Sequence, residues 1–95
     1  MSAPQVPIAL FRLGRIVATP NALNKLTQDD ILTAIRRHQA GDWGDVDHHD
    51  RQANDRALTE GTRLFSVYHS EKQLKFWVIT EAGRLVTTVL MPDDY

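Results

Sequence analysis

Apolar and polar residues alternate along the last third of the chain in three runs, which two short polar connections separate. Alternation of this kind, with many β-branched and aromatic residues, is typical of strands that bury one face. The runs are Thr62 to His69, Leu74 to Thr80 and Leu85 to Met91. The second connection holds Gly83, which can take the positive φ that a tight hairpin turn needs. The pattern predicts an antiparallel three-strand meander.

A further strand is predicted near the N-terminus. Ile8 to Leu13 alternates in the same way, and Ile16 to Ala18 resumes an extended apolar run after Gly14-Arg15, where the chain could bulge or turn. Thr19-Pro20 ends this run, because proline cannot donate a hydrogen bond to a strand ladder. We expect the strand to join the meander in one antiparallel sheet.

Two helices are predicted after this strand. Proline after a threonine cap is a typical helix start, so Thr19-Pro20 predicts a short helix through residue 26. Thr27 and Asp30 have the spacing of a capping box, which predicts a second helix over residues 28–40. This helix should pack on the sheet through an apolar stripe at helical spacing. The stripe consists of Ile31, Leu32 and Ile35.

A third helix is expected from the cap Asp47 to Glu60, with Gly61 as its end. Its apolar stripe is thin, so part of this segment could instead be a loop. The stripe consists of Ala53, Ala57 and Leu58. In the turn before this helix, Trp43 stands between two glycines and is expected to fill the core under the loop.

Together these elements predict an α+β fold, in which an antiparallel sheet carries two to three helices on one face. The chain has 95 residues and is 42% hydrophobic, which suits a single domain that buries roughly 60 to 65% of its unfolded surface. Residues 1–6 and 92–95 are expected to be flexible.

The composition argues against several classes of function. Eleven Lys and Arg stand against twelve Asp and Glu, so no global positive field would hold a polyanion. The absence of cysteine excludes disulfides, thiolate metal sites and thiol nucleophiles. No apolar run approaches the roughly 20 residues that span a bilayer, and the start lacks the pattern of a signal peptide. We therefore expect a cytoplasmic protein without a membrane segment or cofactor.

One candidate binding site is the basic segment Arg36-Arg37-His38 together with Trp43. Cations beside an aromatic ring can hold a phosphate and stack a base, which would give a local nucleic-acid site. The same residues also have ordinary structural uses. Basic residues suit the C-terminus of a helix, and one tryptophan suits a core.

A second candidate is the Asp- and His-rich run between residues 42 and 50. Its members are Asp42, Asp45, Asp47, His48, His49 and Asp50. Neighbouring His48 and His49 point about 100° apart on a helix and cannot both face one ion, so we predict no metal site. The run has four Asp and no Lys or Arg, so it could instead meet a basic groove on a partner protein.

A third candidate is a catalytic set for metal-independent RNA cleavage, which needs a base, an acid and a cation for the phosphorane charge. The residues that could fill these roles are His38, His49, Arg56 and Glu81. Such residues occur in most small domains, and no phosphate loop, nucleophile elbow or carboxylate pair accompanies them. The preferred expectation is therefore no catalytic residues.

Several segments resemble a family of small bacterial proteins that plasmids and other mobile elements carry. The motifs are RHxxGDWG at 37–44 and WVITEA at 77–82, with NDRAL at 54–58, TTVL at 87–90 and the PDDY ending. This resemblance covers most of the chain and implies a setting without naming a chemistry. The order of elements is also similar to that of the RelE and barnase-like ribonuclease toxins, in topology only.

A mobile-element setting implies two functions. The first, which we prefer, is a binder that occupies a host or defence-system macromolecule, as anti-restriction and anti-CRISPR proteins do. The alternative is a RelE- or barnase-like endoribonuclease toxin. For the binder the expected partner is a protein, and the expected contacts are Arg36, Arg37, Asp42, Trp43, Asp45, Asp47 and Asp50.

Overall fold

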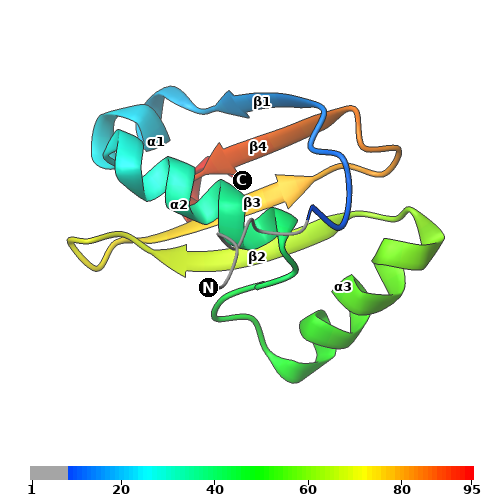
Figure 1. Cartoon of the computed structure of the whole chain (residues 1–95). Coiled ribbons are helices and arrows are strands. Elements are labelled where there is room, and N and C mark those ends of the chain that lie inside the picture. The colour runs from blue at the N-terminus through cyan, green and yellow to red at the C-terminus, as the bar shows by residue number, and fades with distance from the viewer. Residues whose placement is uncertain (1–8) are drawn as a thin grey trace, which may run out of the picture.

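A computed structural model describes residues 9–95, and the predicted flexible segment 1–6 lies outside them. The elements in chain order are β1 (Arg15–Ala18), α1 (Pro20–Lys25), α2 (Gln28–Gln39), α3 (His48–Glu60), β2 (Leu64–His69), β3 (Lys75–Thr80), β4 (Val86–Leu90) and the 3-10 helix η1 (Pro92–Asp94). The α+β fold and the meander are confirmed (Figure 1). The segment from 48 to 60, which could have been part loop, is helical throughout.

The four strands form one mixed sheet in the order β1-β4-β3-β2, so the prediction of a purely antiparallel sheet was wrong. β1 pairs with β4 in parallel, whereas β4 with β3 and β3 with β2 are antiparallel. The reason lies in the connections. Helices carry the chain from β1 back to the start of β2, which makes those two strands parallel, and the first and third strands of a meander are parallel to each other.

The N-terminal strand is shorter than predicted. Of the expected run from residue 8 to 13, the described residues form no strand, and β1 begins only at Arg15. The segment is attached to the end of α2 instead: Leu10 N–H donates to the Gln39 carbonyl at 2.9 Å, and the Gln39 side chain donates to the Phe11 carbonyl at 3.0 Å. Gly14, with a φ of 65°, then turns the chain into β1.

All three helices begin at the predicted caps. Thr19 Oγ1 accepts from Ala22 N–H, Asp47 accepts from Asp50 N–H, and the Thr27 capping box makes both of its hydrogen bonds. α2 buries Ala34 and Ile35 against the sheet, as predicted for Ile35. Leu32, which was expected to be buried in the same stripe, is instead 44% exposed.

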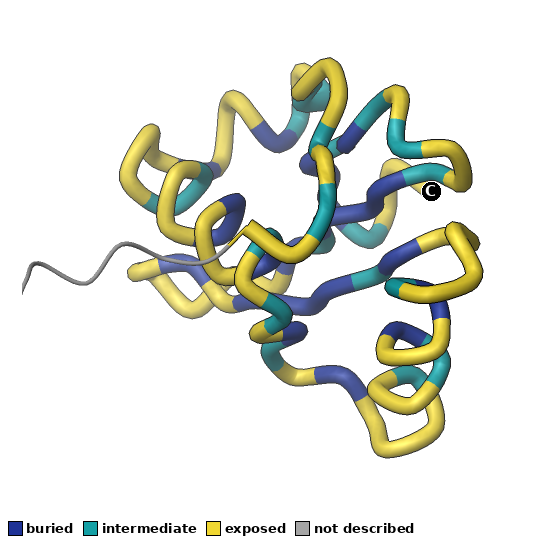
Figure 2. Tube along the Cα trace, turned by 45° about the vertical axis from the view of Figure 1, so that its right-hand side comes forward, coloured by how far each residue is buried: buried dark blue, intermediate teal, exposed yellow. Residues whose placement is uncertain are grey.

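The two faces of the sheet differ. α1 and α2 cover one face of the sheet (Figure 1), and much of the strands beneath them is buried (Figure 2). On that face Ala22 and Ile35 pack with Phe76, Val78 and Val89. α3 lies along the outer edge of β2 instead of over a face. On the opposite face, no α-helix formed by residues 9–95 covers the strands. We call this opposite side the open face.

The edge of β2 beside α3 is closed by hydrogen bonds. The Asn54 side chain of α3 donates to the Phe65 carbonyl at 2.7 Å and accepts from Phe65 N–H at 3.0 Å. Two residues along, Val67 N–H donates to the Trp43 carbonyl, and the Val67 carbonyl accepts from Asp45 N–H. Trp43 itself is 2% exposed, which confirms that it fills the core under its loop.

The C-terminal residues 92–95, expected to be flexible, are held by hydrogen bonds. Asp94 Oδ2 accepts from Thr19 Oγ1 at 2.6 Å and from Met91 N–H at 2.9 Å. η1 thereby places Tyr95 against Trp77 on the open face. Among residues 9–95, no helix has the length and apolar character needed to cross a membrane.

Candidate functional site

His38, the first candidate base, lies fully buried between α2 and the sheet. Its Nδ1 is 2.6 Å from Ser66 Oγ and its Nε2 is 2.9 Å from Thr80 Oγ1. Thr80 Oγ1 is 2.7 Å from Thr87 Oγ1, which donates to the Leu13 carbonyl at 2.7 Å. The imidazole is thus one member of an internal chain of hydrogen bonds.

The final acceptor fixes every proton in this chain. A carbonyl can only accept, so the Thr87 hydroxyl gives its hydrogen to Leu13, and Thr80 must donate to Thr87. Thr80 then accepts from His38 Nε2–H, and Nδ1 accepts from Ser66. We assign His38 as the neutral Nε2–H tautomer on this basis. Burial, with the positive charge of Arg84 adding to it, lowers the pKa of His38 to about 3.

The other three candidate catalytic residues do not join His38. His49 and Arg56 are exposed on α3, and Glu81 at the end of β3 accepts from Arg63 at 3.2 Å. In the described part of the chain no hydrogen bond or ion pair links any two of the four. A neutral, enclosed imidazole cannot reach an RNA hydroxyl. The geometry therefore assembles no acid–base pair from this set.

The basic segment also serves the fold. Arg37 forms a two-point ion pair with Asp42, with Nε 2.7 Å from Oδ2, and its guanidinium lies 4.7 Å from the centre of the Tyr68 ring. The Trp43 ring stacks on Phe11 at 6.2 Å, so its face is not available to a base. Arg36 and Arg37 are both exposed, and of the two only Arg36 makes no side-chain hydrogen bond within residues 9–95.

The Asp- and His-rich run at residues 42–50, which we call the acidic stretch, contains carboxylates that stabilise the fold and carboxylates that make no hydrogen bond or ion pair with the described residues. Asp42 is paired with Arg37, which lowers the pKa of its carboxyl, and Asp47 caps α3. Asp45 is exposed, and Asp50 is half-buried at the start of α3. Neither Asp45 nor Asp50 makes a side-chain hydrogen bond or ion pair to any residue from 9 to 95. No group of three or more His, Asp or Glu in that range is placed to hold a metal ion.

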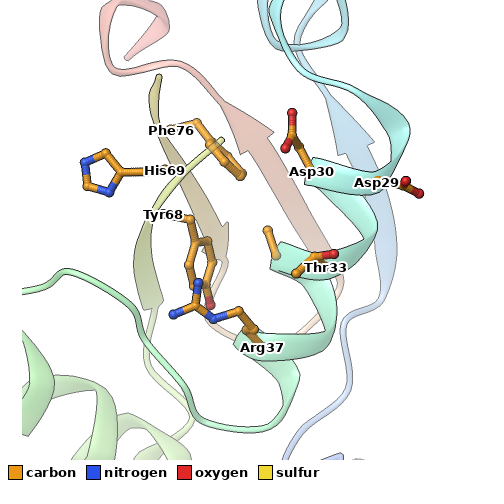
Figure 3. A pocket seen from close by; sticks show the side chains of 8 residues that line it. Asp29, Asp30, Thr33, Arg37, Tyr68, His69 and Phe76 are labelled. Carbon is orange, nitrogen blue, oxygen red and sulfur yellow. The ribbon is translucent and has the colours of Figure 1, made fainter. Parts of the chain in front are cut away.

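A hollow of about 130 Å³ lies between α2 and the ends of β2 and β3 (Figure 3). Its walls are already occupied with internal contacts. Arg37 stacks over Tyr68, and Asp30 accepts from the backbone N–H of Thr27 and Glu71. Figure 3 shows the Asp29 and His69 side chains pointing away from its centre. This hollow offers few free groups to a ligand.

The open face holds a larger hollow, of about 320 Å³. Alternation along β2 and β3 turns Phe65, Trp77 and Ile79 away from the helices, and Tyr95 reaches the same place from η1. Its lining consists of Asp50, Arg63, Phe65, Trp77, Ile79 and Tyr95. We call this site the aromatic hollow.

Three aromatic rings shape the aromatic hollow. Trp77 is the central one: its ring centre is 5.2 Å from that of Phe65, at 77° between planes, and 5.7 Å from that of Tyr95, at 67°. Beside them Arg63 donates to the Tyr95 hydroxyl at 2.8 Å and to Glu81 at 3.2 Å. Because Ile79 beneath them is only 4% exposed, the rings rest on a packed floor.

The sequence analysis missed most of this site and named only Asp50 of its lining. Large aromatics at outward positions of two neighbouring strands, Phe65 and Trp77, were the available signal. Recognising it required knowing that no α-helix within residues 9–95 covers this face and that Tyr95 folds back onto Trp77. Comparison with known proteins adds nothing to these residues: no family model, curated protein or solved structure matches the chain.

Proposed function

We propose that this protein acts by binding another protein through the aromatic hollow. The observation that carries the proposal is that Phe65, Trp77 and Tyr95 line a hollow of about 320 Å³ on the open face of the sheet. Trp, Tyr and Arg are the side chains most enriched at the energetic centres of protein interfaces, and such centres lie in well-packed pockets.

The rigidity of the site supports the proposal. Trp77 and Phe65 stand on adjacent strands that pair with each other along their whole length, and the Tyr95 hydroxyl accepts a hydrogen bond from Arg63. Side chains that are already ordered lose little conformational entropy when a partner arrives. A rigid aromatic surface therefore suits a protein that works by occupying its partner.

The setting of the proposal comes from the resemblance to mobile-element proteins. We place the protein in the bacterial cytoplasm as an inhibitor of a host or defence-system protein, of the anti-restriction or anti-CRISPR kind. The formal net charge of -1 suits a protein partner better than an RNA. The ribonuclease alternative gains no support from geometry, since His38 is enclosed and its three companions lie apart.

The test begins with capture of partners from a bacterial extract, followed by purification of the captured protein and measurement of its Kd. Trp77→Thr and Tyr95→Ala should each weaken binding by tenfold or more, as is usual for interface centres. Leu85→Ala is the matched control, because Leu85 is an apolar side chain, 80% exposed, outside the hollow. Thermal melting checks that each variant folds.

Two results would overturn the proposal. One is a purified complex whose Kd is the same for wild type, Trp77→Thr and Tyr95→Ala. The other is RNA cleavage by the wild-type protein that disappears in a His49→Ala, Arg56→Ala variant with unchanged melting, which would establish the nuclease instead.

A further inference from the structure

We infer that the aromatic hollow receives a basic side chain, lysine or arginine, from the partner. This inference rests on the proposed function and specifies the chemistry of the same site. It is carried by two features that occur together: three aromatic side chains line the hollow, and the Asp50 carboxylate beside them makes no hydrogen bond or ion pair with residues 9–95.

The ring arrangement suits a cation. Phe65 and Tyr95 each lie steeply inclined to Trp77, so the three rings do not form a flat stack. A cation near an aromatic face is attracted by the negative face of the ring, most strongly by tryptophan. The aliphatic stem of a lysine or arginine can lie on the apolar floor at Ile79 while its head stays among the rings.

The charges around the hollow favour the same ligand. Arg63 is paired with Glu81, 3.2 Å from its Nε, while its Nη1 donates to the Tyr95 hydroxyl and its guanidinium lies 5.9 Å from the centre of the Tyr95 ring. Asp50 lines the hollow, yet its carboxylate makes no hydrogen bond or ion pair with any residue described between 9 and 95. Because Glu81, which lies outside the lining, already pairs with Arg63, Asp50 is the lining carboxylate whose charge has no partner among residues 9–95. Lys75 shares this face of β3 but does not line the hollow.

Other occupants fit less well. An apolar plug would cover Asp50 without supplying a partner for its charge, which is unfavourable. An anionic group would meet Asp50 directly and would have to separate Arg63 from Glu81. A cation satisfies Asp50 and leaves the Arg63 pair in place.

The experiment uses small probes and the whole chain, so it does not depend on knowing the partner. Arginine amide and lysine amide, each acetylated at Nα so that the side chain keeps its positive charge, are titrated into ¹⁵N-labelled protein. The uncharged Nα-acetyl-norleucine amide is titrated beside them. The indole N–H of Trp77 reports on the hollow. The indole of Trp43 is an internal reference, because it is buried and donates to Asp55 at 3.1 Å.

We expect the cationic probes to shift the Trp77 signal at concentrations about tenfold lower than norleucine amide, and the Trp43 signal to stay in place. Asp50→Asn should remove this preference, and added salt should reduce it. Asp45→Asn is the matched control: it removes an exposed carboxylate from the same acidic stretch but outside the hollow, and should change nothing.

The inference is wrong if norleucine amide binds as well as the cationic probes, if no probe moves Trp77, or if Asp45→Asn acts like Asp50→Asn. Its failure is separable from that of the proposed function. A complex with the captured partner that is weakened by Trp77→Thr but not by Asp50→Asn would keep the protein-binding function and eliminate the basic side chain.

Discussion

His38 Nε2 and Thr80 Oγ1 lie 2.9 Å apart in the interior, and this bond joins α2 to the last residue of β3, an inner strand of the sheet. The bond belongs to a chain that runs from Ser66 through His38, Thr80 and Thr87 to the Leu13 carbonyl. The hydroxyls of Thr80 and Thr87 each both donate and accept. A buried polar chain that is fully satisfied fixes the relative positions of its elements, whereas a broken one is costly.

The first prediction concerns the stability of the fold at low pH. The pKa of His38 is about 3 in the folded protein against an ordinary value of 6.5, so the unfolded chain takes up a proton first as pH falls. The contribution of His38 to the free energy of unfolding is therefore at its maximum above pH 6.5. It falls as the pH is lowered from 6.5 to 3, with a limiting slope of about 1.4 kcal/mol per pH unit. Urea unfolding at several pH values measures it.

The control for this prediction is His49→Ala, which removes an exposed histidine and should leave the slope unchanged. A free energy of unfolding that stays flat from pH 6.5 to 5 in the wild type would contradict the assignment of His38 as the source.

The second prediction concerns the hydroxyl beside His38. Thr80→Val keeps the shape of the side chain but leaves His38 Nε2–H without an acceptor and Thr87 without a donor. Leaving buried polar groups unsatisfied should lower the free energy of unfolding by about 1 to 3 kcal/mol. Thr88→Val, the same change at a half-buried site on the open face, should cost less than about 0.5 kcal/mol. Equal effects of the two changes in denaturant unfolding would refute the role given to the chain.

The third prediction concerns the closed edge of β2. Asn54→Ala removes both hydrogen bonds to the Phe65 backbone and leaves that N–H and carbonyl without their partners. We expect a loss of about 2 to 4 kcal/mol, together with faster amide exchange at Phe65. Gln52→Ala, on the exposed side of the same helix, is the control. Unchanged exchange at Phe65 in Asn54→Ala would show that the edge does not depend on this side chain.

Local signals in the sequence were sufficient for much of the fold. The caps at Thr19, Thr27 and Asp47 depend on neighbouring residues, and each helix begins where its cap predicts. The alternation of β2, β3 and β4 is equally local, so the meander could be predicted. What failed was the pairing of β1, which depends on how long helical connections return across the sheet.

The candidate site was harder to predict for the same reason. Asp50 and Trp77 are 27 positions apart in the chain, and the hollow they share exists only because α3 lies at the edge of β2. In the opposite direction, a reactive-looking residue such as His38 proved to be internal, because helical spacing placed it on the buried side of α2. A histidine is a plausible catalytic base by residue type, but the burial of His38 keeps its imidazole from any substrate.

The last prediction separates the carboxylates of the acidic stretch. Asp47 Oδ1 accepts from Asp50 N–H at 2.8 Å and so satisfies one of the free N–H groups at the start of α3. Asp47→Ala should therefore destabilise the protein by about 1 kcal/mol, and Asp47→Asn or Asp47→Ser should restore most of the loss. Asp45→Ala should be nearly neutral, since that side chain has no partner among residues 9–95.

This difference changes how the stretch can be tested for binding. Reversing Asp45, Asp47 and Asp50 together would combine loss of the helix cap with loss of surface charge, so weaker partner binding could follow from damage to α3 alone. Thermal melting of Asp47→Ala beside Asp45→Ala measures the two effects separately. If Asp47→Ala melts at the wild-type temperature, the cap contributes little, and all three charges can be reversed together without that concern.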